Sequence, residues 1–269
     1  MIKHLVLVGC GHMGYAMLRP WVEAHTAENF WVVTPRLDSL QGLDKKGVRH
    51  IAWPEHLPPD VAADIIVLAV RPEILKSILP EYRGQKSLFL SVAAGKPLEF
   101  YQGILGADAA IVRAMPNLPA KVGEGMTLLA SNAAVSAKVR KDVEGLLAPL
   151  GKSVWIDNEP LIDAATAISG CGPAYFYFMV DQLAKIGEEV GLKPELATEL
   201  ARQTFTGSAA LLQKTGEAAD SLYHGIAVKG GLTEAALDVF RKGEVFRKML
   251  HHAVQAATQR ARDLAKSKG

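Results

Sequence analysis

The chain has 269 residues, of which 49% are hydrophobic and 22% charged, so it holds enough apolar material for one large domain or two modest ones. Its 30 basic and 28 acidic residues give a formal net charge of +2, which argues against nucleic acid or an anionic membrane as partner. The two cysteines, Cys10 and Cys171, argue against a disulfide scaffold. With no apolar stretch near ~18 residues and an N-terminal apolar run too short for a signal peptide, we expect a cytoplasmic protein.

The first half of the chain alternates short apolar runs with helical patterns. The apolar runs predict strands at Ile2–Val8, Phe30–Val33, Ile65–Val70, Leu88–Ser91, Ala110–Arg113, Thr127–Ala130 and Ser153–Trp155. Helical patterns between several of them cover Gly14–His25, Arg71–Leu79 and Ser136–Pro149. Apolar strands joined by crossover helices are typical of α/β proteins with a doubly wound, mostly parallel, Rossmann-like sheet.

After about residue 157 the strand-like runs stop and long helical patterns take over. Apolar residues from Phe176 to Val190 recur at spacings of three and four, and Gly191 follows where a helix would end. Further helices are expected over Pro194–Lys214, Thr233–Lys242 and Glu244–Lys266. We therefore expect a dinucleotide-binding domain over 1–157 and an all-helical domain over 158–269.

The first predicted strand leads directly into Gly9-Cys10-Gly11-His12-Met13-Gly14, which has the G-x-G-x-x-G spacing of a dinucleotide-binding turn. In such a turn Gly9 permits the tight bend, Gly11 lets a pyrophosphate approach the backbone, and Gly14 allows close packing of helix on strand. The N–H groups of the helix start, at His12 and Met13, then face the phosphates. The alternative is a structural glycine turn without a ligand.

The second strand is followed by Thr34-Pro35-Arg36, where an NAD enzyme usually has an acidic residue for the ribose hydroxyls. A guanidinium suits the 2′-phosphate of NADPH, which a carboxylate would repel. Thr34 and Arg36 therefore favour NADPH over NADH, although Asp38 lies close by and Arg36 has the alternative of being a solvated loop residue.

Small and polar residues follow two later strands. Ala93, Ala94, Pro116 and Asn117 lie at predicted carboxyl ends of sheet strands, where open α/β folds bind their ligands. Small side chains would admit a nicotinamide ring, and the Asn117 amide would bond its carboxamide or ribose. The competing role of these residues is ordinary turn formation.

Several longer stretches carry a family resemblance in the expected order. They are Ala69-Val70-Arg71-Pro72, Ser91-Val92-Ala93-Ala94-Gly95, Arg113-Ala114-Met115-Pro116-Asn117-Leu118-Pro119-Ala120, Gly125-Met126-Thr127, Ser169-Gly170-Cys171-Gly172-Pro173-Ala174-Tyr175 and Gly230-Gly231-Leu232-Thr233. With them the whole chain resembles the pyrroline-5-carboxylate reductases.

The resemblance implies NADPH-dependent reduction of 1-pyrroline-5-carboxylate to L-proline, a step of proline biosynthesis. It adds Ala69, Val70, Arg71 and Pro72 to the cofactor site. It also implies a helical domain that interlocks with a second subunit, so that the protein is at least a homodimer with an active site between the domains. Two departures concern the substrate: the family's Ser-Pro-Gly-Gly-Thr-Thr reads Val228-Lys229-Gly230-Gly231-Leu232-Thr233 here, and a family serine is replaced by Cys171.

The segment Lys229-Gly230-Gly231-Leu232-Thr233 predicts the clamp for the small-molecule substrate. Two glycines before a helix leave backbone N–H groups free for a carboxylate. The Thr233 hydroxyl would then orient the ring nitrogen or relay a proton, or else cap the helix. Lys229 would pair with the carboxylate, or remain a solvated surface lysine. The reaction needs geometry and electrostatics around a cofactor, and no metal-ligand spacing occurs among the histidines.

Other functions stay open on these residues. A reductase of a different imine would share every motif. A β-hydroxyacid enzyme would place an asparagine one turn after its catalytic lysine, whereas Lys185 is followed at that spacing by Glu189. A catalytically silent NADPH-binding sensor would keep the glycine turn and alter the substrate loop, as the change at Val228-Lys229 would suit. An assay of NADPH oxidation with cyclic imines separates these possibilities.

Overall fold

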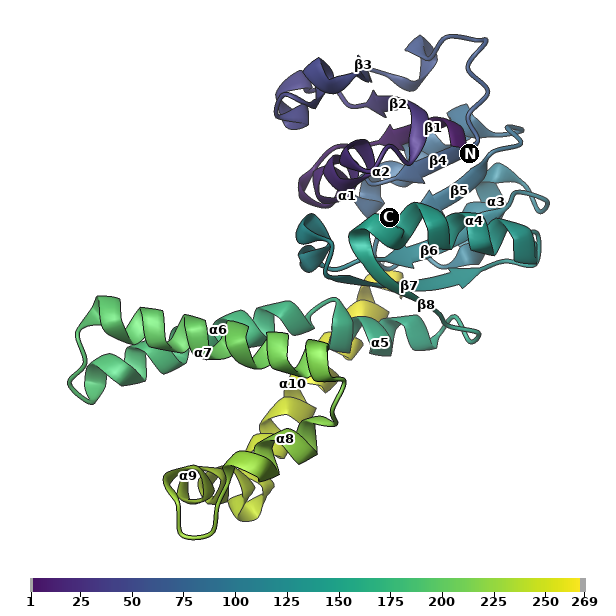
Figure 1. Ribbon diagram of the computed structural model, residues 1–269. Helices are drawn as coiled ribbons and strands as arrows, with labels where there is room; N and C mark the ends of the chain where they lie inside the picture. Colours follow the sequence, from purple (N-terminus) through teal and green to yellow (C-terminus); the bar gives the residue numbers. More distant parts are fainter. Residues whose placement is uncertain (1, 267–269) are drawn as a thin grey trace. The chain divides into compact units, whose positions relative to one another are not determined.

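The computed structural model describes residues 2–266 and divides into two compact units (Figure 1). Residues 2–171 together with residues 257–266 form the first, here called the sheet unit. Residues 172–256 form the second, called the helical unit. Each is described by itself.

The sheet unit is built on one eight-stranded sheet. Its strands are β1 (Ile2–Val8), β2 (Ala27–Val33), β3 (Val48–Ile51), β4 (Ile65–Leu68), β5 (Leu88–Ser91), β6 (Ile111–Met115), β7 (Gly125–Ser131) and β8 (Gly151–Trp155). The strand order is β3-β2-β1-β4-β5-β6-β7-β8, and every neighbouring pair is parallel except β6 and β7. Strands are added on one side of β1 up to β3 and on its other side from β4 onward, so the strand order reverses between β1 and β4. Doubly wound sheets bind their ligands at this switch point. The predicted mostly parallel, doubly wound sheet is confirmed.

Helices cover both faces of this sheet because successive side chains of a buried strand point to opposite faces. In β1, Leu5 and Leu7 pack in one apolar cluster, while Val6 and Val8 pack in the other. The first cluster includes α1 (His12–Glu23) and α4 (Ala137–Leu147). The second includes α2 (Pro72–Ile78) and α3 (Leu98–Leu105). A smaller cluster places α5 (Leu161–Ser169) against β7.

Some elements of the sheet unit differ from the predicted ones. Strand β3 was missed because its sequence Val-Arg-His-Ile is short and polar, and it lies at the edge of the sheet with only Val48 buried. Helices α3 and α5 were also missed. Strand β4 ends at Leu68 rather than at residue 70, and α1 begins two residues earlier than predicted, at His12.

The helical unit contains α6 (Gly172–Glu189), α7 (Pro194–Thr215), α8 (Ala219–Ile226), α9 (Leu232–Arg241) and the first part of α10 (Val245–Lys266). Helices α6 and α7 pack side by side as a hairpin (Figure 1). Their backbones approach closely, since a Cβ added at Gly187 would lie 3.0 Å from Ala197 Cβ. Gly191 turns the chain with φ of +99°. Helix α8 was not predicted.

Most large apolar side chains of the helical unit are exposed in the single chain. Its buried apolar residues are the alanines Ala184, Ala197 and Ala201. The α6 stripe, defined as Phe176, Met179, Leu183, Ile186 and Val190, is solvent-exposed along its whole length. No helix within residues 2–266 has both the length and the apolar character needed to cross a membrane.

Candidate functional site

The glycine turn after β1 has a backbone that two of its glycines make possible. Gly9 has φ of +89°, and a Cβ there would lie 2.7 Å from Val70 Cγ1 and 2.8 Å from the Ala69 carbonyl oxygen. A Cβ at Gly14 would lie 2.6 Å from the Gly9 carbonyl oxygen. Both contacts are too short for any side chain, so packing between β1, α1 and the end of β4 requires these glycines.

Gly11 is different, because the fold alone does not require it to be a glycine. Its φ of −78° suits any residue, and among residues 2–266, apart from Gly11 and its two chain neighbours, no atom lies within 4 Å of a Cβ added there. The missing side chain leaves open space directly before α1. In the first turn of a helix the N–H groups have no intrahelical acceptor, so the amides of His12 and Met13 are available to a ligand.

This open space belongs to a groove of about 770 Å³ at the carboxyl ends of β1, β2 and β4. Eight of the predicted cofactor-binding residues line it: Gly9, Gly11, His12, Thr34, Arg36, Ala69, Val70 and Arg71. The structure therefore brings together the glycine turn, the loop after β2 and the loop after β4. One groove thus contains both the glycine turn, the candidate pyrophosphate site, and Thr34 and Arg36, the candidate 2′-phosphate residues.

The groove also contains residues that sequence reasoning missed. They are Cys10, Tyr15, Asp38, Ser39, Gln41, Ile74 and Lys121. Most of them lie within a few positions of a predicted residue and could have been found by extending each motif. Lys121 is an exception, because it comes from η5 (Leu118–Val122), a 3₁₀ turn that follows β6 and packs beside α1. Only the fold places it in the groove.

Charged groups in the loop after β2 are already paired with one another. Arg36 Nε lies 3.2 Å from Asp38 Oδ1, and Arg36 Nη2 lies 3.2 Å from Asp38 Oδ2, which is a two-pronged contact. Both side chains are more than 70% exposed, at 73% and 72%. The Ser39 hydroxyl donates to the Arg36 carbonyl at 2.6 Å and holds this loop as the 3₁₀ turn η1 (Leu37–Leu40).

Cys10 connects the glycine turn to the same loop. Its side chain is buried, and its Sγ donates to the Ser39 carbonyl oxygen at 3.5 Å. Burial raises the pKa of the Cys10 thiol to about 11, with the hydrogen bond to Ser39 acting in the opposite sense. The thiol is therefore protonated near neutral pH and acts as packing rather than as a nucleophile.

The remaining predicted cofactor residues do not line this groove. They are Met13, Gly14, Pro72, Ala93, Ala94, Pro116 and Asn117. Asn117 makes two bonds inside the protein: its Nδ2 donates to the Ser169 carbonyl at 2.9 Å and its Oδ1 accepts from the Met126 amide at 2.9 Å. Its side-chain amide thereby joins the end of β6 to β7 and to the end of α5.

A partly buried polar cluster lies around Arg113. Arg113 on β6 pairs with Glu159 at 2.6 Å and lies 3.8 Å from Asp163. The Leu98 amide at the start of α3 donates to the same Glu159 oxygen at 2.8 Å. These contacts tie α3 and the beginning of α5 to the centre of the sheet. They fix the segment that carries the chain out of the sheet unit.

A hydroxyl pair completes the interior beneath this cluster. The Tyr101 and Ser91 hydroxyls are 2.6 Å apart and buried. Burial raises the pKa of Tyr101 to about 12, partly offset by its bond to Ser91 and by the nearby Arg113 charge. Tyr101 is therefore neutral at every physiological pH.

In the helical unit, the loop before α9 corrects one expectation about the substrate clamp. Both glycine amides were expected to be free, but Gly230 N donates to Glu234 Oε2 at 2.6 Å and Gly231 N donates to the Val228 carbonyl at 2.9 Å. Gly230 itself has φ of +75°. The amides left for a ligand are those of Leu232 and Thr233, in the first turn of α9.

In the described part of the chain, the side chains of Lys229, Leu232 and Thr233 make no polar contact that would give them a structural role in this loop. Gly231 is the residue that precedes α9, so Thr233 lies inside the helix and does not cap it. Within residues 2–266, neither the Thr233 hydroxyl nor the Lys229 ammonium has a hydrogen-bond or ion-pair partner. Leu232 is 94% exposed. The side chains of Lys229, Leu232 and Thr233 are therefore available to a ligand.

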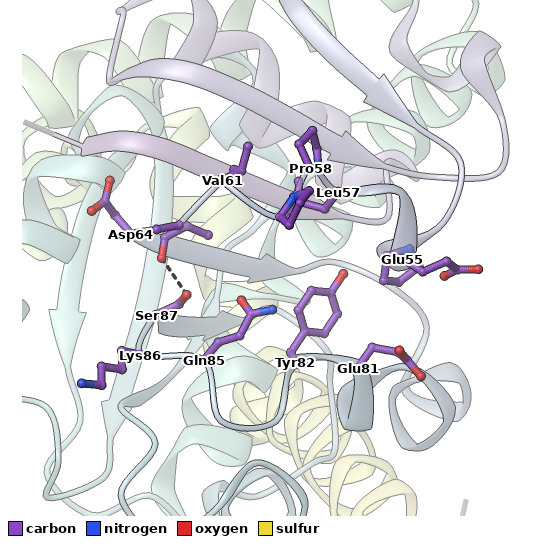
Figure 2. Close-up of a pocket in the computed structure, with 14 residues that line it drawn as sticks. Glu55, Leu57, Pro58, Val61, Asp64, Glu81, Tyr82, Gln85, Lys86 and Ser87 are labelled. Atoms are coloured by element: carbon purple, nitrogen blue, oxygen red, sulfur yellow. Dashed lines mark hydrogen bonds between the residues drawn. The ribbon is translucent and has the colours of Figure 1, made fainter.

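A second groove, of about 620 Å³, lies at the opposite edge of the sheet, beside the amino ends of β4 and β5 (Figure 2). Two of its polar side chains are bonded within the protein: Ser87 donates to the Ala63 carbonyl at 2.6 Å, and Asp64 accepts from the Lys3 amide at 2.7 Å. The Tyr82 hydroxyl is buried, and burial raises its pKa above its usual range. This groove lacks the glycine turn and the α-helix start that the first groove offers to a pyrophosphate.

Comparison with known proteins gives a different family match for each half of the chain. The family described as "Pyrroline-5-carboxylate reductase dimerisation" matches residues 159–264. The family described as "NADP oxidoreductase coenzyme F420-dependent" matches residues 4–95. The chain is 32% identical to the pyrroline-5-carboxylate reductase of Escherichia coli K12 over 273 residues, which cover 99% of this chain and 100% of that protein.

Solved structures give the same likeness. A pyrroline-5-carboxylate reductase from Coxiella burnetii superimposes with a TM-score of 0.90 at 30% identity, covering 99% of this chain and 100% of that one. The pyrroline carboxylate reductase of Plasmodium falciparum, solved with NADP bound, has a TM-score of 0.84 at 31% identity and covers 98% of each chain.

Proposed function

The chain belongs to the pyrroline-5-carboxylate reductase family and reduces 1-pyrroline-5-carboxylate to L-proline with NADPH, and we propose that two separate segments hold the reactants. The groove at the glycine turn binds the cofactor, and the loop before α9 binds the substrate carboxylate. The observation that carries the cofactor part is the open space at Gly11, which the fold does not need and a pyrophosphate does.

The groove fits a phosphorylated dinucleotide in charge as well as in shape. Arg36, Arg71 and Lys121 line it together with His12, against the single carboxylate of Asp38. We assign the pyrophosphate to the backbone of Gly11, His12 and Met13, where a helix begins. Thr34 and Arg36 receive the 2′-phosphate. NADPH supplies the hydride for reduction of the C=N bond, and the protein supplies position and charge.

The remaining sequence-predicted residues keep supporting positions in this proposal. Gly9 and Gly14 shape the turn, Ala69 and Val70 belong to the loop that borders the groove after β4, and Pro72 begins α2 directly after that loop. Ala93, Ala94 and Pro116 follow the neighbouring strands and leave room for the nicotinamide end of the cofactor. Asn117 holds the strand ends in place through its two bonds inside the protein.

The substrate carboxylate is assigned to the amides of Leu232 and Thr233, with Gly230 and Gly231 shaping the turn that exposes them. Lys229 adds a positive charge beside this anion. The Thr233 hydroxyl bonds the ring nitrogen and orients the ring. Reduction adds a hydride to the imine carbon and a proton to its nitrogen, so a hydroxyl at that nitrogen is well placed to hold the protonated form.

For the chain as a whole we propose a dinucleotide-binding domain over residues 1–157 and a helical dimerisation and substrate domain over 158–269. The protein acts in the cytoplasm as at least a homodimer. The exposed α6 stripe supports the assembly, because such a surface on a helix is stabilised by burial against another copy.

The residue assignments are tested by two substitutions in the substrate loop. Oxidation of NADPH is followed at the nicotinamide absorbance band with 1-pyrroline-5-carboxylate as substrate. Thr233→Val should lower kcat by roughly tenfold or more, because a positioned hydroxyl is lost. Lys229→Ala should raise the substrate KM by about fivefold, since a charge-assisted contact is removed.

The control is Lys193→Ala, which removes an exposed lysine from the tip of the α6–α7 hairpin. None of the three variants should change NADPH affinity, which is measured separately by fluorescence titration. Unchanged substrate KM in Lys229→Ala would remove Lys229 from the clamp, and unchanged kcat in Thr233→Val would remove the orienting hydroxyl. Running a six-membered cyclic imine carboxylate in parallel measures how strictly the loop selects the five-membered ring.

A further inference from the structure

We propose that Asp38 is a specificity-determining residue that weakens the preference of this enzyme for NADPH over NADH. This inference rests on the proposed binding of the 2′-phosphate by Arg36. It goes further by assigning a role to the carboxylate that faces Arg36 in the groove.

The geometry places Asp38 in direct competition with a phosphate. Both of its carboxylate oxygens take N–H groups of Arg36, at 3.2 Å each, and these are the donors that would grip a planar or multi-acceptor anion. Arg36 and Asp38 both line the groove. A 2′-phosphate that takes the Arg36 fork must therefore displace the carboxylate.

Displacement is feasible because the pair is exposed. With 73% and 72% of the two side chains accessible, water and salt screen the attraction, and such exposed pairs are weak. A phosphate with nearly two negative charges outcompetes a single carboxylate for the same guanidinium. The displaced Asp38 remains close to the phosphate, however, and the like charges repel. NADPH therefore binds more weakly than Arg36 alone would allow.

The same carboxylate favours the cofactor that lacks the phosphate. An acidic residue after the second strand of this fold accepts hydrogen bonds from the ribose hydroxyls of NAD. Asp38 is two residues beyond Arg36 in the groove, so it can accept a ribose hydroxyl while Arg36 is not occupied by a phosphate. One arginine and one aspartate thus give the groove two modes of binding.

Asp38 has no structural duty that would explain the pair. The loop is held by other bonds: Ser39 Oγ to the Arg36 carbonyl at 2.6 Å, and the Gln41 amide to the Asp38 carbonyl at 3.2 Å. Cys10 Sγ adds a contact with the Ser39 carbonyl. All of these bonds survive replacement of the Asp38 carboxylate by an amide of the same shape.

The test compares dissociation constants of NADPH and NADH for the wild type, Asp38→Asn and Arg36→Ala by fluorescence titration at low ionic strength. Asp108→Asn, an exposed carboxylate in the turn before β6, is the control for net charge. We expect Asp38→Asn to bind NADPH about threefold more tightly and NADH about threefold more weakly, so that the specificity ratio rises about tenfold. The rise should shrink at high salt.

The control arm separates this inference from the proposed function. Arg36→Ala should weaken NADPH and the probe adenosine 2′,5′-bisphosphate, and leave 5′-AMP unchanged; if it weakens neither, the assignment of the 2′-phosphate to Arg36 fails. If Arg36→Ala behaves as expected while Asp38→Asn leaves the NADPH to NADH ratio unchanged, or weakens NADPH binding, the role of Asp38 is overturned and Arg36 keeps its own. A ratio that rises equally in Asp108→Asn would also overturn it.

Discussion

The sheet unit buries its large apolar side chains, whereas the helical unit exposes most of its own. In the sheet unit Trp21, Phe89 and Tyr101 are almost completely buried, and apolar clusters fill both faces of the sheet. In the helical unit the buried apolar residues are alanines, while Leu183 on α6 is 57% exposed. The two units have similarly apolar sequences, so the difference lies in what covers them.

The two units therefore obtain their stability in different ways. The sheet unit has a core of its own and needs no other chain to bury it. The helical unit resembles one half of an interface, in which the apolar faces of long helices pack against a second copy. The match of residues 159–264 to a dimerisation family is consistent with this division.

The largest effect should come from placing a charge in the α6 stripe. Leu183→Asp would bury two carboxylates at a symmetric interface, so we expect the dimer dissociation constant to rise roughly ten-thousandfold, about 5 kcal/mol. Sedimentation velocity measures the shift from dimer to monomer. Gln203→Asp adds the same charge at an exposed polar position of α7 and should leave the dimer intact. A Leu183→Asp protein that remained dimeric would show that the α6 stripe is not buried between two copies.

The next effect concerns the core of the sheet unit. Trp21 on α1 is fully buried, and its Nε1 donates to the Leu146 carbonyl at 2.7 Å. Trp21→Ala should lower the free energy of unfolding by about 4 kcal/mol, because a cavity forms and the carbonyl loses its donor. Urea titrations at two protein concentrations should show the same loss, since this core needs no partner copy.

The matched control for that substitution is Trp53→Ala. Trp53 is exposed, so removing its ring should change the stability by less than about 0.5 kcal/mol. If the loss in Trp21→Ala varied strongly with protein concentration, the sheet unit would not be independent in the sense given above.

A smaller effect should appear at alkaline pH. Burial raises the pKa of Tyr101 from 10.0 to about 12, so the folded state keeps a proton that the unfolded chain releases. The stabilisation is complete below about pH 10 and is lost as the pH rises from about 10 to about 12, by about 3 kcal/mol. Tyr101→Phe should flatten this part of the stability profile. Tyr177→Phe, at an exposed position on α6, should leave the profile as it is.

The smallest effect should separate the glycines of the turn. Gly11→Ala meets no atom, so the protein should keep its stability while NADPH affinity falls about tenfold, or about 1.4 kcal/mol. Gly14→Ala should behave in the opposite order and lose stability, because its Cβ would lie 2.6 Å from the Gly9 carbonyl. Thermal unfolding and NADPH titration of both variants give the four values. Loss of stability in Gly11→Ala would place that glycine among those the fold requires.

The sequence predicted best where one physical requirement acts locally. The strands β1 and β5 were found at their observed bounds because each contains an uninterrupted run of buried apolar residues, Leu5–Val8 in β1 and Leu88–Leu90 in β5. The polar edge strand β3 was missed for the opposite reason. The glycine turn and Arg36 were identified from spacing and charge, whereas Lys121 reaches the groove only through packing of η5 beside α1.

The substrate loop shows where a correct motif leads to an incomplete account of its bonds. The two glycines were recognised, but their amides turned out to be satisfied within the loop, one by the side chain of Glu234 four residues later. Capping by a residue in the first turn of a helix is a local pattern that the sequence did contain. The Asn117 bonds to Ser169 and Met126, by contrast, depend on strand pairing that no local pattern specifies.

The contact between Gly230 N and Glu234 has a consequence for exchange at this loop. Before any ligand binds, the Glu234 carboxylate already accepts a hydrogen bond from the Gly230 amide at 2.6 Å. A ligand carboxylate can bond the Gly230 amide only by displacing the Glu234 carboxylate. This exchange contributes little binding free energy, because the two groups are chemically alike. The affinity of a ligand then depends on its other contacts. A ligand with a second polar atom near Thr233 is favoured, and a simple carboxylic acid dissociates quickly.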